Sequence, residues 1–524
     1  MIVCPLRFAP ERVGYPERGL EPSGFHGSGP VALARWHDDR STDVMSASLH
    51  AEGRSPVTMP EHRGSRPNPK EEHGSITSRL TRLARHAKGR ALRERFPLSS
   101  HAVWRTPSNR PNPLDLLEQS HETRLDELEA LRWGRMGLSP FTFLRGSAMV
   151  MAWDVAHLPH GDVYVQACGD AHLGNFGTFA TPERRLIFDL RDFDETLPAP
   201  WEWDVKRLAA SIIVSARDQG ISDSRASDAV LACMRQYRET MQESVELSYQ
   251  EIWYRRVDAE ELKTGKSKSS RRFGKRWVKK ARKRTSLREM EKLTQIVDGH
   301  RHIKEDHPVI FPIEHGHMHD VIAGILVKYA ATLSRDRRVL FDRYRLVDLA
   351  YRVVGVGSVG TRCMIALFTG DNDDDPLFLQ MKEANRSVLE PFAHHCVYSN
   401  QGERVVQGQR IIQAASDLFL GWKRSGRHDY YVRQLKDMKG TIDFERLTPA
   451  VLAGFAALCG RTLAQAHARS GDFCQIAGYL GESDQFDNAI LEFALSYTEQ
   501  VERDHEAMLK AARGGLMPMA AQLH

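Results

Sequence analysis

The stretch VYVQACGDAHLGNFGTFATPERRLIFDLRDFDE, residues 163–195, holds the pattern that decides the fold. Residues 163–170 form a short β-rich run that ends in a Cys-Gly-Asp turn, and two further strands are predicted on either side of the turn TPER. Helical periodicity follows over residues 204–216 and 226–254. We therefore predict a small β insertion within a mainly helical part of the chain.

An aspartate and an asparagine follow the first of these strands at a fixed spacing. Asp170 closes the turn, and Asn175 lies five residues later in the same loop. Phosphoryl transfer needs a carboxylate near the attacking hydroxyl and an amide oxygen that helps to hold a metal ion, and this spacing supplies both. The spacing alone arises often by chance, so its weight depends on its place after a strand. His172, inside the loop, is a third candidate catalytic residue, with a hydrogen-bonded structural histidine as an equal alternative.

Acidic residues also follow the next apolar strand. Mg²⁺ prefers a few hard oxygen ligands and keeps several waters, so one or two carboxylates of this turn would suit it together with Asn175. We expect Asp192 to be the metal carboxylate, with Asp189 as the alternative and Asp194 also open. A charged loop in which Arg191 pairs with the acids is about equally supported by the local sequence.

A Gly-rich loop lies far from this stretch, at VGVGSVGTR, residues 354–362. Glycines allow a close backbone approach to phosphate groups, so we expect Gly355, Gly357, Ser358 and Gly360 to contact a nucleotide. A plain hairpin turn is the alternative. A dinucleotide-binding loop would be followed by a helix, whereas here a strand follows, which favours a strand–loop–strand phosphate flap.

The next apolar strand carries a lysine near its end. Lys382 requires an anionic partner if it is buried, because an unpaired buried charge is costly. A nucleotide phosphate or a protein carboxylate would serve. We expect the carboxylate to be that of Glu403, at the start of the following helix, ahead of Glu383 and Glu390.

These motifs divide the chain into four segments. Residues 1–75 are rich in Gly, Pro, Ser and Arg, and we predict a disordered extension. Residues 76–335 form a mainly helical lobe that contains the loop 168–175, called the catalytic-type loop below. Residues 336–445 form a β-rich nucleotide-binding lobe, and residues 446–524 form C-terminal helices. The prediction is an α+β fold with two lobes.

Composition narrows the class of protein. The 524 residues carry a formal net charge of +5, with 27% charged and 41% hydrophobic residues, as in an ordinary soluble protein. The seven cysteines show no CxxC pair or zinc-site spacing, which favours a reducing cytoplasm. No apolar run approaches the roughly 20 residues that cross a bilayer, so we expect no membrane partner. The basic run 263–284 offers phosphate contacts to nucleic acid, although such runs are more often solvated helix faces.

Five sequence blocks carry a resemblance to a known family. They are CGDAHLGNFG (168–177), FDLRDFDETLPAPWEWDVKRLAAS (188–211), VGVGSVGTR (354–362), LQMKEA (379–384) and GERVVQGQR (402–410). Their order and content resemble the bacterial family known only as domain of unknown function two-two-five-two, over roughly residues 80 to 510. That name implies no activity, so function depends on the site.

A looser resemblance is to aminoglycoside phosphotransferases and protein kinases. It implies ATP and Mg²⁺ as cofactors, Asp170 as catalytic base, and Asp204 as a helix residue that braces the catalytic loop. Cys168 stands where these enzymes carry histidine, and DFD replaces DFG. Kinases place the Gly-rich loop first, so we predict a circularly permuted kinase-like fold. An inactive nucleotide-binding pseudokinase and a nucleic-acid-associated protein are the alternatives, and the acceptor and the oligomeric state stay open.

Overall fold

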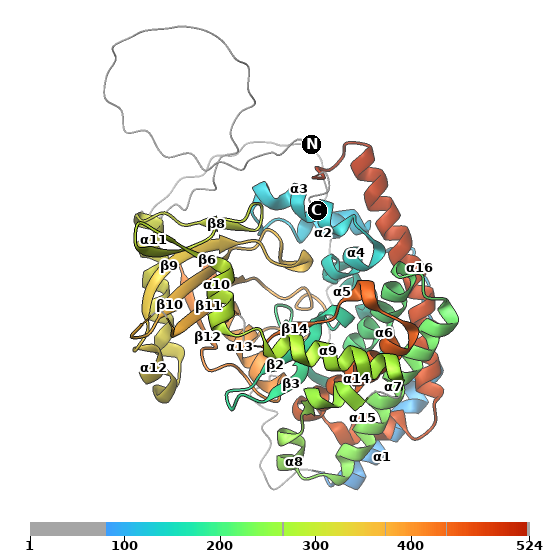
Figure 1. Cartoon of the computed structure of the whole chain (residues 1–524). Helices are drawn as coiled ribbons and strands as arrows, with labels where there is room; N and C mark the ends of the chain where they lie inside the picture. The colour runs from blue at the N-terminus through green and yellow to red at the C-terminus, as the bar shows by residue number, and fades with distance from the viewer. Residues whose placement is uncertain (1–79, 265–266, 373, 436–437, 521–524) are drawn as a thin grey trace, which may run out of the picture.

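The computed structural model describes residues 80–264, 267–372, 374–435 and 438–520. Within these residues a sheet-rich part lies on one side of the molecule and most of the helices lie on the other (Figure 1). This arrangement confirms the predicted α+β class. The predicted extension, residues 1–75, lies outside the described residues.

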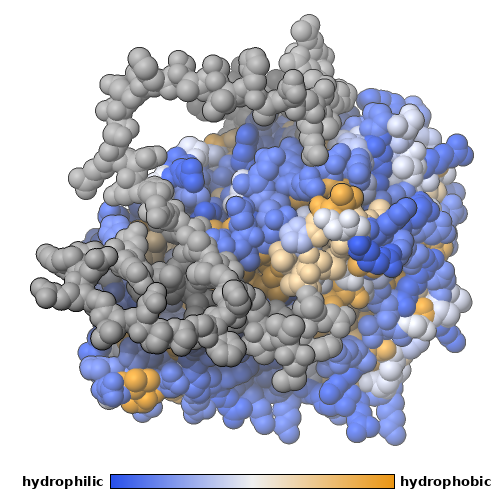
Figure 2. Space-filling view, turned by 90° about the horizontal axis from the view of Figure 1, so that it is seen from above, coloured by the Kyte–Doolittle hydropathy of each residue, from blue (hydrophilic) through white to orange (hydrophobic). Residues whose placement is uncertain are grey.

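Polar residues cover most of the face of the molecule seen in Figure 2, and hydrophobic residues gather in one patch of it. Among the described residues, no helix has both the length and the apolar composition that a membrane span requires. Most large apolar side chains are instead buried in the cores described below.

The helical part combines elements from both ends of the chain. Its helices are α1 (Arg82–Arg95), α2 (Pro113–Gln119), α3 (Glu129–Met136), α4 (Pro140–Gly146), α5 (Ala148–Ala156), α6 (Trp201–Asp218), α7 (Asp223–Glu246), α8 (Tyr249–Tyr254), α9 (Lys268–Arg282), α14 (Pro449–Ser470), α15 (Phe473–Leu480) and α16 (Gln485–Arg513).

Helix α6 lies at the centre of this part. Its residues from Trp201 to Ala216 are all buried, so every face of the helix packs against other elements. Helix α16 packs against α6, α14 against α7, and α15 against α1. The C-terminal helices that the sequence sets apart as residues 446–524 therefore share one hydrophobic core with α6 and α7.

Two small antiparallel sheets carry the stretch that opened the sequence analysis. β1 (Tyr164–Ala167) pairs with β4 (Leu197–Pro200). β2 (Phe176–Ala180) and β3 (Leu186–Leu190) form the hairpin around the TPER turn, as predicted. Two later strands extend the second sheet, whose order is β14-β2-β3-β5: β5 is at Val257–Asp258, and β14, at Gly440–Thr441, begins 250 residues after β3 ends at Leu190.

A larger antiparallel sheet forms the other part, with the strand order β12-β13-β11-β10-β9-β8. The strands are β8 (Ile310–Pro312), β9 (Arg345–Arg352), β10 (Cys363–Thr369), β11 (Pro376–Ala384), β12 (Gly421–Ser425) and β13 (His428–Gln434). The associated helices are α10 (Ser286–Leu293), α11 (His317–Tyr329), α12 (Arg335–Phe341) and α13 (Gln401–Ile412), and a hairpin of β6 (Thr294–Val297) and β7 (His300–Ile303) adjoins them.

Both faces of this sheet are covered. Met364, Ala366 and Phe368 of β10 belong to a core with residues of α11, and Ile365 and Leu367 belong to a second core with residues of α10. Alternate residues of a strand point to opposite faces, which explains why every residue of β10 is buried. Helices α10, α11 and α12 thus pack with the sheet, although the sequence assigns residues up to 335 to the helical part.

Glycine is required where β1 turns toward Asp170. Gly169 has φ +81°, and a Cβ atom built there would lie 2.4 Å from the Glu195 carbonyl oxygen. Gly220 also has a positive φ, +66°, but no described residue comes within 4 Å of its Cβ position. The two glycines therefore differ in steric contact and share the left-handed backbone.

We predict that Gly220→Ala costs about 1–2 kcal/mol of unfolding free energy, the ordinary cost of left-handed backbone for an L-residue. Gly169→Ala is expected to cost more, because the new methyl group collides with backbone that cannot move away independently. Urea unfolding of both variants measures the difference. Equal losses would show that the turn relaxes around the added carbon.

Candidate active site

The loop after β1 is held in place from helix α6. The two carboxylate oxygens of Asp204 accept hydrogen bonds from the backbone N–H groups of Cys168, at 2.6 Å, and Gly169, at 2.9 Å. His467 of α14 places Nε2 3.3 Å from the Asp204 carboxylate and its Nδ1 2.8 Å from the hydroxyl of Tyr237. Because a carboxylate only accepts, His467 donates from Nε2. Asp204 thus has the bracing contact with the loop that the kinase resemblance implies.

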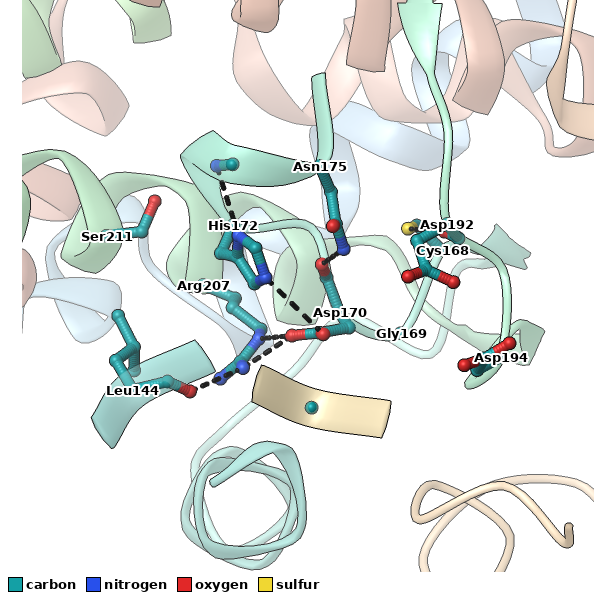
Figure 3. Close-up of polar contacts among 12 residues, drawn as sticks. Leu144, Cys168, Gly169, Asp170, His172, Asn175, Asp192, Asp194, Arg207 and Ser211 are labelled. Atoms are coloured by element: carbon teal, nitrogen blue, oxygen red, sulfur yellow. Dashed lines mark hydrogen bonds and ion pairs between the residues drawn. The ribbon is translucent and has the colours of Figure 1, made fainter. Parts of the chain in front are cut away.

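Asp170 contacts a buried arginine, as Figure 3 shows, and also lines a cavity. Arg207 of α6 reaches Oδ1 with both Nε and Nη2 at 2.5 Å and also donates to the Leu144 carbonyl at 2.9 Å. Oδ2 lies 3.6 Å from His172 Nε2, beyond hydrogen-bond distance, and remains available. Burial raises the pKa of Asp170 to about 7, although Arg207 alone would lower it. A carboxylate with this pKa is suited to accept a proton at neutral pH.

His172 orients the loop from within. Its Nδ1 accepts a hydrogen bond from the backbone N–H of Gly174 at 3.0 Å. Burial, together with Arg145 and Arg207, lowers the pKa of His172 well below its ordinary value. The ring is therefore neutral at physiological pH, and the geometry agrees with the alternative of a structural histidine.

Asn175 and Asp192 offer oxygen atoms to a cation. The amide nitrogen of Asn175 donates to the Asp170 carbonyl at 2.6 Å, which leaves the amide oxygen for another partner. Asp192 Oδ1 is buried without a hydrogen-bond partner among the described residues. An unpaired buried carboxylate oxygen is costly, and a bound cation would satisfy it. One carboxylate and one amide oxygen, completed by water and phosphate oxygens, are the usual donors to Mg²⁺.

Asp189, the alternative ligand, faces elsewhere. It is 3% exposed, and its two oxygens accept hydrogen bonds from the N–H groups of Leu190 and Ala414. It does not line the cavity that contains Asp192. No cluster of three or more His, Cys, Asp or Glu side chains suited to a metal occurs in the described part of the chain. A metal site here would thus depend on Asn175 and water as well as on Asp192.

Lys382 is bound by Asp194, the last residue of the turn Asp192–Asp194, which is called the DFD turn below. The ammonium group contacts the Asp194 carboxylate and donates to Ser358 Oγ at 2.6 Å. The hydroxyl of Tyr431 donates to the other Asp194 oxygen at 2.7 Å. Burial lowers the pKa of Lys382, but Asp192 and Asp194 reverse this and raise it, so the lysine is charged. Burial raises the pKa of Asp194, and Lys382 outweighs that effect and brings it to about 2.

The structure therefore pairs Lys382 with Asp194, where the sequence predicts Glu403. Glu403 lies in the first turn of α13 and does not line the cavity. Its neighbour Arg404 is the residue of α13 that reaches this region, because it donates to the backbone carbonyls of Asp194 and Thr196 at 2.8 and 2.7 Å. Helix α13 supports the DFD turn through an arginine and not through a glutamate.

The Gly-rich loop closes over the same cavity. Gly355, Gly357 and Ser358 line it, whereas Gly360, with φ +90°, lies outside its lining and packs on the side chain of Arg124. Arg124 also donates to the carbonyl of Gly357 at 2.9 Å. The loop is thus tied from the helical part through Arg124.

One cavity of about 200 Å³ brings most of the predicted site residues together. From the helical part it is lined by Asp170, His172, Asn175 and Asp192, and from the sheet part by Gly355, Gly357, Ser358 and Lys382. A larger cavity of about 380 Å³ adjoins Arg433, which lines both, but none of the predicted site residues lines the larger one. The chemically competent side chains converge on the smaller cavity, which is therefore the candidate site.

Comparison with known proteins places this chain in a family. The family model described as uncharacterized protein conserved in bacteria (DUF2252) matches residues 124–511. The chain belongs to this family. No curated protein and no solved structure matches the chain. Every cavity-lining residue described above lies within the matched region of this family member.

The basic run of this family member has its aromatic residues turned inward. Trp277 of α9 is 6% exposed and donates from Nε1 to Thr178 Oγ1 at 3.1 Å. Phe273 packs edge-on against it, with ring centroids 5.5 Å apart. The Trp277 ring is therefore unavailable for base stacking, Phe273 is half-buried against the core, and most of the lysines and arginines of α9 are exposed.

Sequence reasoning missed several residues of the site. Asp194 was left open as a metal ligand and instead binds Lys382, while Arg145, Arg207 and Arg404 were not singled out. Arg207 and Arg404 each lie among buried positions of a helix, at 3% and 1% exposure. The sequence could have indicated these two arginines, because a charged residue on an otherwise apolar helix face requires a buried partner.

The raised pKa of Asp170 generates a prediction about stability. Between its ordinary value of 3.8 and about 7, the folded protein holds a proton on Asp170 that the unfolded chain has lost. Unfolding free energy therefore falls as pH rises through this window. Asp170→Asn removes the titration and keeps an acceptor for Arg207.

Relative to Asp170→Asn, the wild type is expected to lose stability between about pH 4 and pH 7, by at most roughly 1.4 kcal/mol per pH unit, and to level off above pH 7. Urea unfolding at several pH values measures the difference. A difference that does not change with pH would contradict the assignment.

Proposed function

We propose that this chain is a kinase-like phosphotransferase that transfers the γ-phosphoryl group of ATP, bound with Mg²⁺, to a hydroxyl acceptor. The observation that carries the proposal is the single cavity in which Asp170, Asn175 and Asp192 meet the Gly-rich loop and Lys382. These groups come from parts of the chain about 200 residues apart, and phosphoryl transfer requires all of them around one triphosphate.

The order of elements in the sheet part supports a kinase-like fold with two lobes. Strand β9, the Gly-rich loop, β10, the lysine strand β11 and helix α13 follow one another along the chain. Protein kinases carry a Gly-rich loop, a lysine on the third strand and helix C in the same order. Helix α14 packs against β1 and contacts Asp204 through His467, where an unpermuted kinase has the helix before its catalytic loop. The proposed fold is therefore circularly permuted.

Each residue has a defined part in the proposed reaction. The acceptor oxygen forms a bond to the γ-phosphorus as the bond from that phosphorus to the β,γ-bridging oxygen breaks, and the electron pair of this bond leaves on ADP. The acceptor proton passes to Asp170 Oδ2, the oxygen that Arg207 leaves free. Lys382 and the backbone of the Gly-rich loop bind the phosphates. Asp192 and Asn175 would hold Mg²⁺, which would supply positive charge to the phosphate oxygens.

A cytoplasmic location is inferred from the proposed substrate, ATP. ATP is a cytoplasmic substrate, and the proposal places the protein there. The six cysteines within the described residues are all free thiols, in agreement with a reducing environment.

Two matched substitutions test the proposal. Asp192→Asn is expected to weaken ATP binding in Mg²⁺ about tenfold or more, because it removes the carboxylate charge at the proposed metal position. Asp170→Asn is expected to keep ATP affinity and to lose about 10²- to 10⁴-fold in turnover, the usual contribution of a general base. Calorimetry with Mg²⁺ and ATP and an assay of ADP release provide the two readouts.

Asp342→Asn, at an exposed carboxylate in α12's cap, serves as the control and should change neither quantity. Wild-type turnover should also rise with pH through about 7 and lose this dependence in Asp170→Asn. Wild-type protein that binds no ATP with Mg²⁺ would refute the proposal. Binding without turnover would instead assign the chain to the pseudokinase class.

A further inference from the structure

Arg145 is a cavity-lining arginine without an ion pair. The other arginines near the Gly-rich loop and the catalytic-type loop are engaged: Arg124 with backbone carbonyls of the loop, Arg132 with Ser120, and Arg207 with Asp170. Arg145 forms no hydrogen bond or salt bridge with any described residue, and its Nε is buried without a partner. Its one defined contact is with the Phe141 ring, at 5.9 Å from the centroid.

The backbone that carries Arg145 is fixed on both sides. Helix α4 begins with a capping box at Ser139 and ends at Gly146. The Leu144 carbonyl accepts from Arg207 at 2.9 Å, and the Gly146 carbonyl accepts from Arg132 at 3.4 Å. Arg207 is the residue that holds Asp170, so Arg145 and the proposed base are positioned by the same side chain.

The guanidinium group lies between the two loops that would enclose a phosphate chain. A Cβ atom on Gly174, in the catalytic-type loop, would lie 3.5 Å from Arg145 Nε. A Cβ atom on Gly355, in the Gly-rich loop, would lie 3.9 Å from Arg145 Nη2, and one on Gly357 would lie 3.1 Å from the Arg145 carbonyl. Glycine at these positions leaves room around the arginine.

The electrostatic surroundings keep this arginine charged without neutralising it. Burial lowers the pKa of Arg145, and the charges of Asp170 and Asp192 act in the opposite direction. Neither carboxylate is within hydrogen-bond distance of it, since no such contact occurs among the described residues. A partly buried cation without a bound partner favours an anionic ligand.

We propose that Arg145 is a catalytic residue that binds the transferring phosphoryl group and stabilises the charge on its oxygens in the transition state. This inference rests on the proposed function. Arg145 donates hydrogen bonds only: the bond from the acceptor oxygen to phosphorus forms, the bond from phosphorus to the bridging oxygen breaks, and the proton goes to Asp170. An arginine supplied within the same chain has this role in some nucleotide hydrolases.

The test compares ground-state and transition-state ligands. Wild-type protein and Arg145→Gln are titrated with ATP, with ADP, and with ADP plus aluminium fluoride, which imitates the transferring phosphoryl group, all with Mg²⁺. ATP hydrolysis, with water as the acceptor, is measured in parallel. Arg225→Gln, at an exposed arginine of α7 that pairs with Asp228, is the matched control.

We expect Arg145→Gln to bind ATP and ADP within about threefold of the wild type, to lose the tighter binding given by aluminium fluoride, and to lose about 100-fold or more in hydrolysis. Guanidinium ion added to Arg145→Ala should restore part of the hydrolysis, which a structural role would not produce. Arg145→Lys repeats the comparison if the glutamine variant is unfolded in a melting experiment.

If aluminium fluoride still increases the affinity of Arg145→Gln for ADP as it does for the wild type, the inference is overturned and the proposed function stays intact. A loss of ATP affinity equal to the loss of hydrolysis would also overturn it, because the residue would then bind the ground state equally. Wild-type protein that binds no nucleotide would overturn both.

Discussion

The Asp194 carboxylate joins the two parts of the site. It belongs to the DFD turn of the helical part, and three side chains of the sheet part converge on it: Lys382, Ser358 and Tyr431. Lys382 is 2% exposed, so its charge would be unpaired in the interior without this carboxylate. Breaking one member of a buried ion pair typically costs about 3–5 kcal/mol. Through Ser358 and Lys382, this carboxylate connects the Gly-rich loop and the lysine strand to the turn that carries Asp192.

Three arginines, of which Arg207 and Arg404 are buried and Arg124 is half-buried, connect the irregular segments around the cavity. Arg404 binds the carbonyls of Asp194 and Thr196, Arg124 binds the Gly-rich loop, and Arg207 connects Asp170 to helix α4. Arginine suits this use because its planar group donates several hydrogen bonds in fixed directions and stays charged when buried. The loops have few strand or helix partners of their own, so these donors satisfy carbonyl groups that would otherwise be left without hydrogen bonds.

Two carboxylates in the one cavity have opposite pKa shifts. Asp194, against Lys382, has a pKa of about 2, and Asp170, whose burial outweighs Arg207, has a pKa of about 7. Titratable groups whose environments separate their pKa values in this way often differ in chemical role. Asp194 is suited to a permanent structural charge, and Asp170 is suited to exchange a proton near neutral pH.

Much of the secondary structure around the site followed from local pattern. The hairpin of β2 and β3, the lysine strand, and the helix that was expected to start near Glu403 and is observed over Gln401–Ile412 are consequences of periodicity and turn residues. The loop spacing identified Asp170 and Asn175, and the acidic turn after the next strand identified Asp192; all three line the cavity.

Contacts across the cavity could not be predicted from the local sequence pattern. Asp194 takes the place expected for Glu403 because the partner of Lys382 depends on how the sheet part is oriented against the DFD turn, which no local period encodes. Asp189 alternates with Leu190 on a strand buried on both faces, so its sequence position could not tell which side meets the cavity. The packing of α11 against the sheet was missed for the same reason, since its apolar face has no sequence mark of its partner.

The most direct test of the central claim is a crystal structure of the protein with Mn²⁺ and a non-hydrolysable ATP analogue, in which anomalous scattering locates the metal. The account predicts a metal peak about 2.0–2.3 Å from oxygens of Asp192 and Asn175, beside a triphosphate lying under the Gly-rich loop with its last phosphorus facing Asp170. A metal bound elsewhere, or a nucleotide outside the cavity that Lys382 and Asp192 share, would contradict it.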